Sequence, residues 1–225
     1  GNLANKYQYA LITVGQIKSP LLRMKLFELA EKSGFILPSI ISPRAYISKY
    51  TTVGKGTIIM HDALINADTQ IGKNCIINPS VVIGGRSKKY KVPVIGDNVF
   101  INDCVHIGCV NNVRIGNNVL MASKIFISDH NHGYYGSSQC DLHQSPEIPP
   151  AHRLLSSDAS VCIGDNVWIG ESVSILAGSD IGRGSIIGAN SIVSGTIPPF
   201  SIAVGVPAVV IKVYCDIDKV WRSVQ

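Results

Sequence analysis

The chain has 225 residues, of which 46% are hydrophobic but only 7% aromatic, and its formal net charge is +5 at pH 7. No apolar run approaches the roughly 18 residues that a membrane span requires, and no basic stretch followed by an apolar one indicates a secretory leader. The modest positive charge suits an anionic ligand without indicating nucleic-acid binding. The six cysteines form no Cys-x-x-Cys pair, so we expect free thiols in a cytoplasmic protein.

The first forty residues are expected to form a strand followed by a helix. Residues 9–14 are rich in β-prone side chains, and residues 21–30 place Leu22, Leu26 and Leu29 on one helical face. Gly34 is a natural stop for that helix. We therefore predict an N-terminal strand–helix segment over residues 1–40, with its leucine face docked on the first part of the following domain.

From residue 41 onward, large aliphatic residues recur every six positions, with three interruptions. A period of six fits neither the 3.6 of a helix nor the 2 of a free-standing strand pair. It is typical of a parallel β-helix, in which each hexapeptide makes one flat side and points one aliphatic residue inward. We predict such an all-β solenoid over residues 41–213. The periodic residues are Ile41, Ile47, Val53, Ile59, Ile65, Ile71, Ile77, Ile83, Ile95, Ile101, Ile107, Ile115, Met121, Ile127, Ile163, Ile169, Ile175, Ile181, Ile187 and Val193.

Gly or Asn follows many of these periodic residues, as in Ile71-Gly72, Ile77-Asn78 and Ile163-Gly164. Corners between flat sides need tight backbone, often with a positive φ, which Gly and Asn tolerate best. We therefore expect the residue directly after each periodic position to take the corner conformation.

Three segments depart from the repeat. Residues 85–91 form a short basic loop, and residues 214–225 follow the last hexads as a tail or a short helix. The largest interruption, about 129–160, holds four of the six histidines beside three prolines. A long irregular segment inside a regular scaffold is usually functional. Its histidines are His130, His132, His143 and His152.

Three motifs make a resemblance specific, and they cover residues 127–133, 163–170 and 197–208. They are Ile127-Ser128-Asp129-His130-Asn131-His132-Gly133, Ile163-Gly164-Asp165-Asn166-Val167-Trp168-Ile169-Gly170, and Ile197-Pro198-Pro199 with Ala203-Val204-Gly205-Val206-Pro207-Ala208. With these motifs the chain resembles the hexapeptide-repeat acyltransferases, and most of all the sugar O-acetyltransferases of surface-polysaccharide synthesis. Residues 7–80 are also similar to sialic-acid and amino-sugar acetyltransferases, whose small N-terminal domain receives a nucleotide sugar.

The resemblance implies a left-handed parallel β-helix that assembles as a homotrimer. It also implies acetyl-CoA as co-substrate, bound in the groove between neighbouring prisms, and a sugar or nucleotide sugar as acceptor. Only the last part of the nucleotide-sugar domain of the amino-sugar branch has a counterpart here, in residues 1–40.

A sugar hydroxyl is a poor nucleophile at neutral pH, so its attack on a thioester needs a positioned base, for which histidine is the usual choice. The resemblance places His132 on the catalytic histidine. Asp129 and Glu147 are the two candidates to orient its ring, and the sequence offers no geometry that chooses between them. His130 would contact the acceptor or stabilise a turn. Asn102 falls on an acceptor-binding asparagine, although a plain corner asparagine would occupy the same position.

The same resemblance assigns the cofactor site to the later coils. Trp168, Gly170, Ala189 and Ser194 fall where the pantetheine arm of CoA lies, and a backbone N–H near Gly170 would serve the oxyanion. Stacking of the coils, without any cofactor, would also require small residues at Gly170 and Ala189. Two cations, Lys212 and Arg183, are candidates for the CoA phosphates. Many relatives carry a lysine where this chain has Gly195, and Arg86, Lys88 or Lys89 would have to compensate.

Alternative functions remain open. In the amino-sugar branch the catalytic histidine follows a segment matching residues 74–78, but residues 79–85 contain none, which favours a hydroxyl acceptor over an amine. N-acetylation of a nucleotide-linked amino sugar is the first alternative. A hexapeptide-repeat carbonic anhydrase needs zinc-binding histidines five positions apart, and His106 has Ile101 and Asn111 at that spacing. No metal site is therefore expected. A non-catalytic scaffold is the remaining alternative, because solenoids often serve as binding surfaces.

Overall fold

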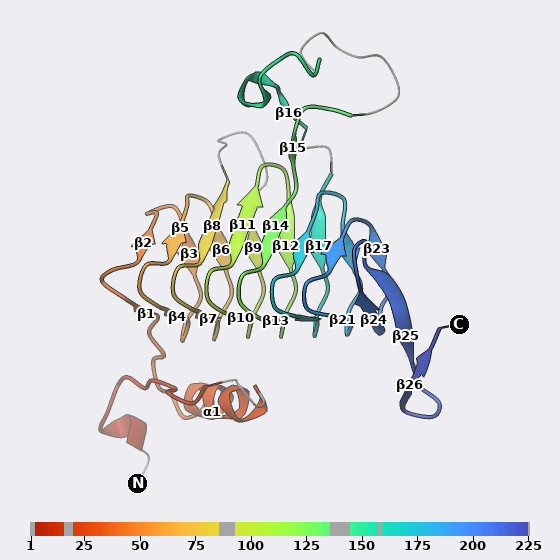
Figure 1. The fold of residues 1–225 in the computed structure, drawn as a ribbon. Helices are drawn as coiled ribbons and strands as arrows, with labels where there is room; N and C mark the ends of the chain where they lie inside the picture. The colour runs from red at the N-terminus through yellow and green to blue at the C-terminus, as the bar shows by residue number, and fades with distance from the viewer. Residues whose placement is uncertain (1–2, 16–19, 86–92, 136–144, 157–158, 225) are drawn as a thin grey trace.

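The computed structural model describes residues 3–15, 20–85, 93–135, 145–156 and 159–224. From residue 40 to residue 204 the chain winds into a three-sided prism (Figure 1). Each side is a parallel β-sheet, and successive coils each add one short strand to every side. The predicted β-solenoid with a short N-terminal α/β segment is confirmed.

The three sides are called here the first, second and third face. The first face contains β1 (Ile40–Ile41), β4 (Ile58–Ile59), β7 (Ile76–Ile77), β10 (Phe100–Ile101), β13 (Leu120–Met121), β18 (Trp168–Ile169), β21 (Ile186–Ile187) and β24 (Ser201–Val204). The second face contains β2 (Tyr46–Ile47), β5 (Leu64–Ile65), β8 (Val82–Gly85), β11 (His106–Cys109), β14 (Phe126–Ser128), β19 (Ser174–Ile175) and β22 (Ile192–Val193). The third face contains β3 (Thr52–Val53), β6 (Gln70–Ile71), β9 (Val94–Ile95), β12 (Val113–Ile115), β17 (Val161–Ile163), β20 (Asp180–Ile181) and β23 (Thr196–Ile197).

The strand register shows how the chain absorbs the three interruptions of the repeat. In a regular coil the paired residues are eighteen positions apart, as in Ile41 and Ile59. The step is longer between Ile77 and Ile101, and longest between Met121 and Ile169. The periodic residues on either side of each interruption still pair with each other.

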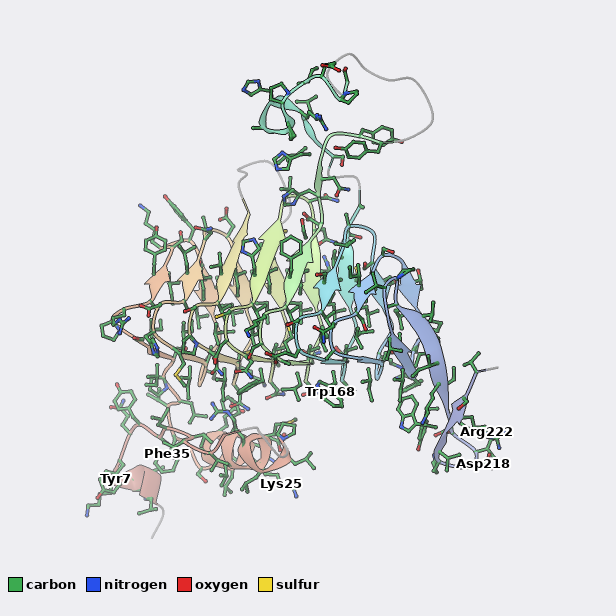
Figure 2. The ribbon with its side chains drawn as sticks, viewed as in Figure 1. Tyr7, Lys25, Phe35, Trp168, Asp218 and Arg222 are labelled. Carbon is green, nitrogen blue, oxygen red and sulfur yellow. The ribbon has the colours of Figure 1, made fainter. Side chains whose placement is uncertain are left out.

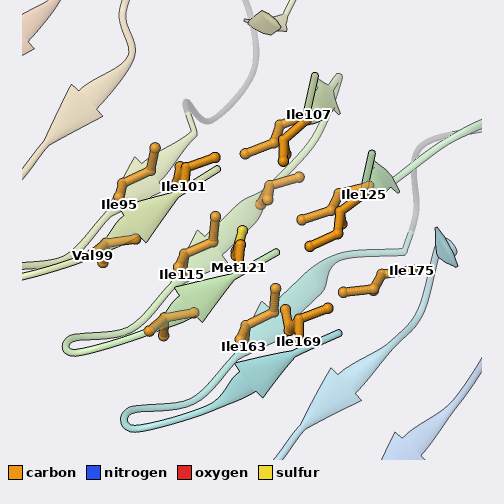
Figure 3. Close-up of a cluster of buried hydrophobic side chains, with 14 of the residues drawn as sticks. Ile95, Val99, Ile101, Ile107, Ile115, Met121, Ile125, Ile163, Ile169 and Ile175 are labelled. Atoms are coloured by element: carbon orange, nitrogen blue, oxygen red, sulfur yellow. The ribbon is translucent and has the colours of Figure 1, made fainter. Parts of the chain in front are cut away.

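The core of the prism consists of the periodic aliphatic residues. From Ile59 to Val193 each of them is at most 4% exposed, and they stack in rows along the prism axis (Figure 3). A second buried residue lies two positions earlier, as in Val99 and Ile125. Ile41 is 46% exposed because it lies in the first coil, which is covered on one side only. The residues that recur every six positions are therefore the ones that point into the core of the prism.

The expected corner conformation occurs two positions later than predicted. Positive φ recurs at the third residue after the periodic one, for example at Asn74 (55°), Asn98 (57°) and Asn166 (59°). The glycine directly after a periodic residue has a different purpose. A Cβ added at Gly116 would lie 2.8 Å from the backbone of Gly164 in the next coil. Close stacking of coils, and not a positive φ, requires glycine there.

The N-terminal segment is only partly as predicted. Helix α1 (Leu21–Lys32) follows a short 3-10 turn, η1 (Leu3–Asn5), and ends just before Gly34, which has a φ of +89°. The expected strand over residues 9–14 is reduced to a single parallel bridge between Tyr9 and Ile36. No helix within the described ranges is long and apolar enough to cross a membrane.

The leucine face of α1 is not the docked face. Leu22 and Leu29 are 55% and 60% exposed, whereas the buried positions are Arg23, Phe27 and Ala30. A Cβ on Gly56, in the first coil, would overlap the ring of Phe27. The helix therefore packs on the β-helix through the face that carries Phe27.

Arg23 explains why this face is buried. Its Nη1 donates to the carbonyl oxygens of Ile12 and Val14 at 2.6 and 3.2 Å, and its Nη2 donates to that of Gly56 at 3.2 Å. The guanidinium thus satisfies backbone carbonyls of two segments that have no sheet partner for them, while its Nε is buried without a hydrogen-bond partner in the described part of the chain.

Two further segments project from the prism (Figure 1). Residues 131–135 and 145–156, called here the arm, lie outside the second face after β14. At its base β15 (Asn131–His132) pairs antiparallel with β16 (Leu155–Ser156), and a short 3-10 turn, η3 (Pro150–His152), precedes β16. At the other end, β25 (Val209–Cys215) and β26 (Val220–Ser223) extend the first face as antiparallel strands. The C-terminal tail is therefore a β-hairpin and not a helix.

Candidate active site

A groove on the outside of the second face gathers three of the histidines. It has a volume of about 300 Å³ and lies where β8 and β11 meet the base of the arm. Its polar lining consists of Asn66, His106, His130 and His132, and its apolar lining includes Val82 and Leu155. The groove is thus formed by four successive coils of the prism together with the arm.

His130 lies against a buried carboxylate. Its Nδ1 is 3.0 Å from Oδ1 of Asp129, and its side chain is 21% exposed while that of Asp129 is fully buried. The hydroxyl of Ser128 lies 3.3 Å from the same ring nitrogen. With the proton on Nδ1 donated to Asp129, the Nε2 atom of His130 is left as a hydrogen-bond acceptor.

Three backbone N–H groups hold Asp129 in place. The N–H of Val110 donates to Oδ1 at 2.8 Å, and those of Asn111 and Asn112 donate to Oδ2 at 2.8 and 2.7 Å. These bonds satisfy the hydrogen-bonding capacity of the buried carboxylate and fix its orientation. All three donors come from the turn between β11 and β12, where the repeat slips by two residues. The geometry of His130 is therefore fixed by the preceding coil.

His132 has a different partner. It lies on β15 in the arm and is exposed, and its Nδ1 is 3.2 Å from the carbonyl oxygen of Pro150. Asp129, which was expected to orient this ring, is paired with His130 instead. Glu147, the other expected partner, is exposed, and its backbone N–H donates to the hydroxyl of Ser145. Both candidate histidines line the groove, but only His130 has a carboxylate partner in the described residues.

Cys109 also lines the groove but is a poor nucleophile. Burial, and then the nearby charge of Asp129, raises the pKa of its thiol to about 12. A thiol with this pKa is protonated at neutral pH, so it carries little of the thiolate that nucleophilic catalysis requires.

A second groove, of about 330 Å³, lies on the first face. It is lined by Asn78, Phe100, Asn102, Leu120 and Trp168, among others. Trp168 is 50% exposed, and Figure 2 shows it projecting from the side of the prism opposite the arm. Asn102 accepts a hydrogen bond of 2.7 Å from Asn78. Asn102 and Trp168 therefore lie together, but not in the histidine groove of the same chain.

The remaining cofactor candidates lie in the later coils. Gly170 is buried, and a Cβ there would lie 2.7 Å from the backbone nitrogen of Ala189, so coil stacking alone accounts for glycine. Its N–H donates to the carbonyl of Ile187 at 2.8 Å and is therefore not available to an oxyanion. Ala189 and Ser194 are exposed on neighbouring corners.

The cationic candidates differ in their surroundings. Lys212 is half-buried in β25 opposite Ile202, and the guanidinium of Arg183 lies 4.9 Å from the centre of the Phe200 ring. A Cβ at Gly195 would meet no atom within 4 Å, so a longer side chain would fit there. Arg86, Lys88 and Lys89 lie outside the described residues. Within the described residues no three His, Cys, Asp or Glu side chains gather to hold a metal ion.

Two features of the groove were missed from the sequence. One is the pairing of Asp129 with His130, for which the two-residue slip after Ile107 is a usable signal, because a longer turn presents free N–H groups to the next coil. The other is His106, which stands one position before a periodic residue and therefore points outward on the second face.

Comparison with known proteins identifies the repeat. The six-repeat family described as bacterial transferase hexapeptide matches residues 50–85 and 163–195. The chain therefore carries the hexapeptide repeat in these two stretches. Over 127 residues it is 50% identical to WbbJ of Escherichia coli K12, a protein named as an O-acetyl transferase of lipopolysaccharide biosynthesis. That alignment covers 56% of this chain and 63% of WbbJ. The resemblance to hexapeptide-repeat sugar acetyltransferases is thereby confirmed.

Other relatives match shorter stretches of the chain or match it at lower identity. The bifunctional protein GlmU of Geotalea uraniireducens is 35% identical over 83 residues, which are 35% of this chain and 18% of GlmU. Among solved structures, PerB from Caulobacter crescentus, in complex with CoA and GDP-perosamine, superposes with a TM-score of 0.48 at 23% identity. That superposition covers 84% of this chain and 65% of PerB. The hexapeptide-repeat chain thus spans less than two thirds of the length of either curated relative.

Proposed function

We propose that this protein transfers an acetyl group from acetyl-CoA to a hydroxyl of a sugar or nucleotide sugar used in surface-polysaccharide synthesis. The observation that carries this proposal is the pair of Asp129 and His130, which leaves one imidazole nitrogen as a base in a groove of suitable size. The 50% identity to WbbJ supports the hydroxyl as acceptor and the acetyl group as cargo. A cytoplasmic location belongs to the same proposal.

The roles of the two histidines are proposed in the reverse of the order that the resemblance implies. His130 is the general base, because a buried carboxylate held by three N–H groups fixes its ring and stabilises the imidazolium that forms. His132 contacts the acceptor from the arm, where an exposed carbonyl is the only described partner of its ring. Buried and fully hydrogen-bonded contacts keep a geometry that exposed ones lose easily.

In the proposed reaction Nε2 of His130 accepts the proton of the acceptor hydroxyl. The hydroxyl oxygen attacks the carbonyl carbon of the thioester, and the tetrahedral intermediate then breaks its C–S bond. The proton passes from His130 to the departing sulfur. The products are the acetyl ester of the sugar and CoA with a free thiol, so atoms and charge balance.

We further propose that acetyl-CoA binds along Trp168, Ala189 and Ser194, with Lys212 near its phosphates and Gly170 allowing close approach. Trp168 offers a large exposed apolar ring in the groove of the first face. Because Trp168 and Asn102 lie on a different face from His130, a complete site would need the first face of one protomer beside the second face of another.

The outward-facing positions support this assembly as a homotrimer. On the first face they are largely apolar, as in Phe100, Leu120 and Ile186, whereas on the third face they include Gln70 and Arg114. Apolar faces of this kind are the ones that association buries. Light scattering should return three times the chain mass of 24.1 kDa, and a monomer would contradict the composite site.

The test of function is acetyl transfer to a defined panel. Purified protein is incubated with acetyl-CoA and, separately, with methyl glycosides, sugar nucleotides and amino-sugar nucleotides, and CoA thiol release and product mass are measured. An ester product, labile in mild alkali, is expected. An alkali-stable amide would support the N-acetyltransferase alternative. Absence of both transfer and acetyl-CoA binding would support a non-catalytic scaffold.

A further inference from the structure

His106 is the histidine of the groove to which the proposed reaction gives no role. It lies on β11 at the same register position as Val82 on β8 and Phe126 on β14. Its ring is stacked with that of Phe126, with 5.7 Å between centroids and 10° between planes. Two neighbours in one outward row thus flank the imidazole along the prism axis. They restrict its rotation and leave its edge at the groove.

The floor of the groove beneath this edge carries no side chains. Gly84 and Gly108 are paired in register on neighbouring coils. A Cβ added at Gly108 would lie 3.3 Å from Cε1 of His130 and 3.7 Å from Nε2 of His106. Both imidazoles therefore border the same point above Gly108. At Gly84 an added Cβ would overlap Nδ2 of Asn66, so the amide of Asn66 covers the other end of the floor.

We infer that His106 is an acceptor-binding residue, which hydrogen-bonds a sugar oxygen next to the hydroxyl that His130 deprotonates. The glycine floor lets the sugar ring come close to the backbone, and the apolar wall at Val82 suits the C–H groups of a pyranose. The inference rests on the proposed function, since it assigns the groove to the acceptor. It specifies an acceptor with neighbouring oxygens, one for each imidazole.

The first experiment needs no knowledge of the natural acceptor. Imidazole signals of the 15N-labelled full chain are recorded while methyl glycosides of glucose, galactose, mannose and rhamnose are added in turn, with signals assigned through histidine-to-glutamine variants. At least one glycoside should shift the signals of His106 and His130 together. The exposed His61, which lies outside the groove, should not respond. If no glycoside shifts His106, or if His130 alone responds, the inference is overturned.

The second experiment measures acetyl transfer to the glycoside that binds. His106→Ala should raise the KM for that acceptor by about tenfold, roughly the loss of one good hydrogen bond, while the KM for acetyl-CoA stays unchanged. His106→Gln, which keeps a donor, should recover most of the loss, and His61→Ala is the matched control. Equal increases in both KM values, or none, would overturn the inference.

Gly108→Ala tests the shared point directly. The added methyl group would come between the two imidazoles, so it should abolish the paired signal shifts while the melting temperature stays close to that of the parent. Persistence of the paired shifts in Gly108→Ala would contradict the placement. Glycoside binding to both rings without any acetyl transfer would refute the proposed function but leave the acceptor site standing.

Discussion

The edge of the prism at Asp129 and the arm that follows it each supply one histidine to the groove, but they hold it differently. At the edge, His130 bonds to a carboxylate that is fully buried and receives three backbone N–H groups. In the arm, Gly133 is the one buried residue among those described, and every other described residue is exposed or half-buried. Two residues of sequence therefore separate a rigid position from a weakly held one.

The largest expected contrast between the two regions is in stability. Ile127, which precedes the edge, is fully buried, so Ile127→Asp places an unpaired charge in the core. The cost of several kcal/mol is comparable with the whole stability of many domains, and circular dichroism should show an unfolded protein. Leu154→Asp in the arm, at a position that is 68% exposed, should melt like the parent. Equal destabilisation by both would remove the distinction.

The next contrast concerns the two carboxylates. Asp129→Asn keeps the volume but removes the charge that orients His130, and its amide group would face backbone donors. We expect kcat to fall by about 10²-fold or more and the melting temperature to fall as well. The matched control is Glu147→Gln in the arm, which should change neither. Near-normal kcat in Asp129→Asn would show that the edge does not organise the base.

A smaller effect is expected from the contacts within the arm. The hydroxyl of Tyr135 donates to the carbonyl of His132 at 2.6 Å and accepts from Arg153 at 3.1 Å. Tyr135→Phe should increase local opening of the arm by up to about tenfold, measured as faster limited proteolysis there. The melting temperature should not change. A matching loss of global stability would mean that the arm is part of the prism's cooperative unit.

The smallest expected effect concerns the thiol beside Asp129. Burial raises the pKa of Cys109, and likewise that of Cys75, to about 12 from an ordinary 9.0. Because the folded state keeps these protons longer, the stability they contribute is present below pH 9 and lost as pH rises toward 12. The free energy of unfolding measured with urea should therefore decrease between pH 8 and pH 10.5. The decrease should be smaller in Cys109→Ala. Exposed Cys104 should alkylate at pH 8 while Cys109 does not.

The regular part of the molecule was predictable because one inward residue in every six leaves little freedom. The six-residue period places Ile101 and Met121 in one inward row. The structure pairs these two residues although the coil between them is two residues longer than a regular coil. The corner conformation was misplaced by two positions, because the sequence shows that glycine is needed but not whether φ or close stacking requires it. Asn98 takes the positive φ, while Gly96 avoids overlap with the next coil.

The sequence is least informative for side chains whose hydrogen-bond partners belong to distant segments of the chain. Helical periodicity selected the leucines of α1, but Arg23 is buried because unpaired carbonyls of Ile12 and Gly56 accept its hydrogen bonds. Our proposal of His130 as the base likewise uses a partner held by the turn at Val110 in the preceding coil, whereas the sequence-based assignment of His132 stays a prediction. Patterns along one segment do not reveal such partners, although the two-residue slip marked the turn itself.

The most direct test is a comparison of His130→Gln with His132→Gln under the same conditions, using acetyl-CoA and the best acceptor of the panel. Glutamine keeps a polar side chain of similar length but cannot take the proton of a hydroxyl. The account predicts that kcat falls at least about 10²-fold in His130→Gln with acetyl-CoA affinity unchanged, and less than about tenfold in His132→Gln. The reverse ranking, or near-full activity in His130→Gln, would contradict the assignment of the base to the prism edge.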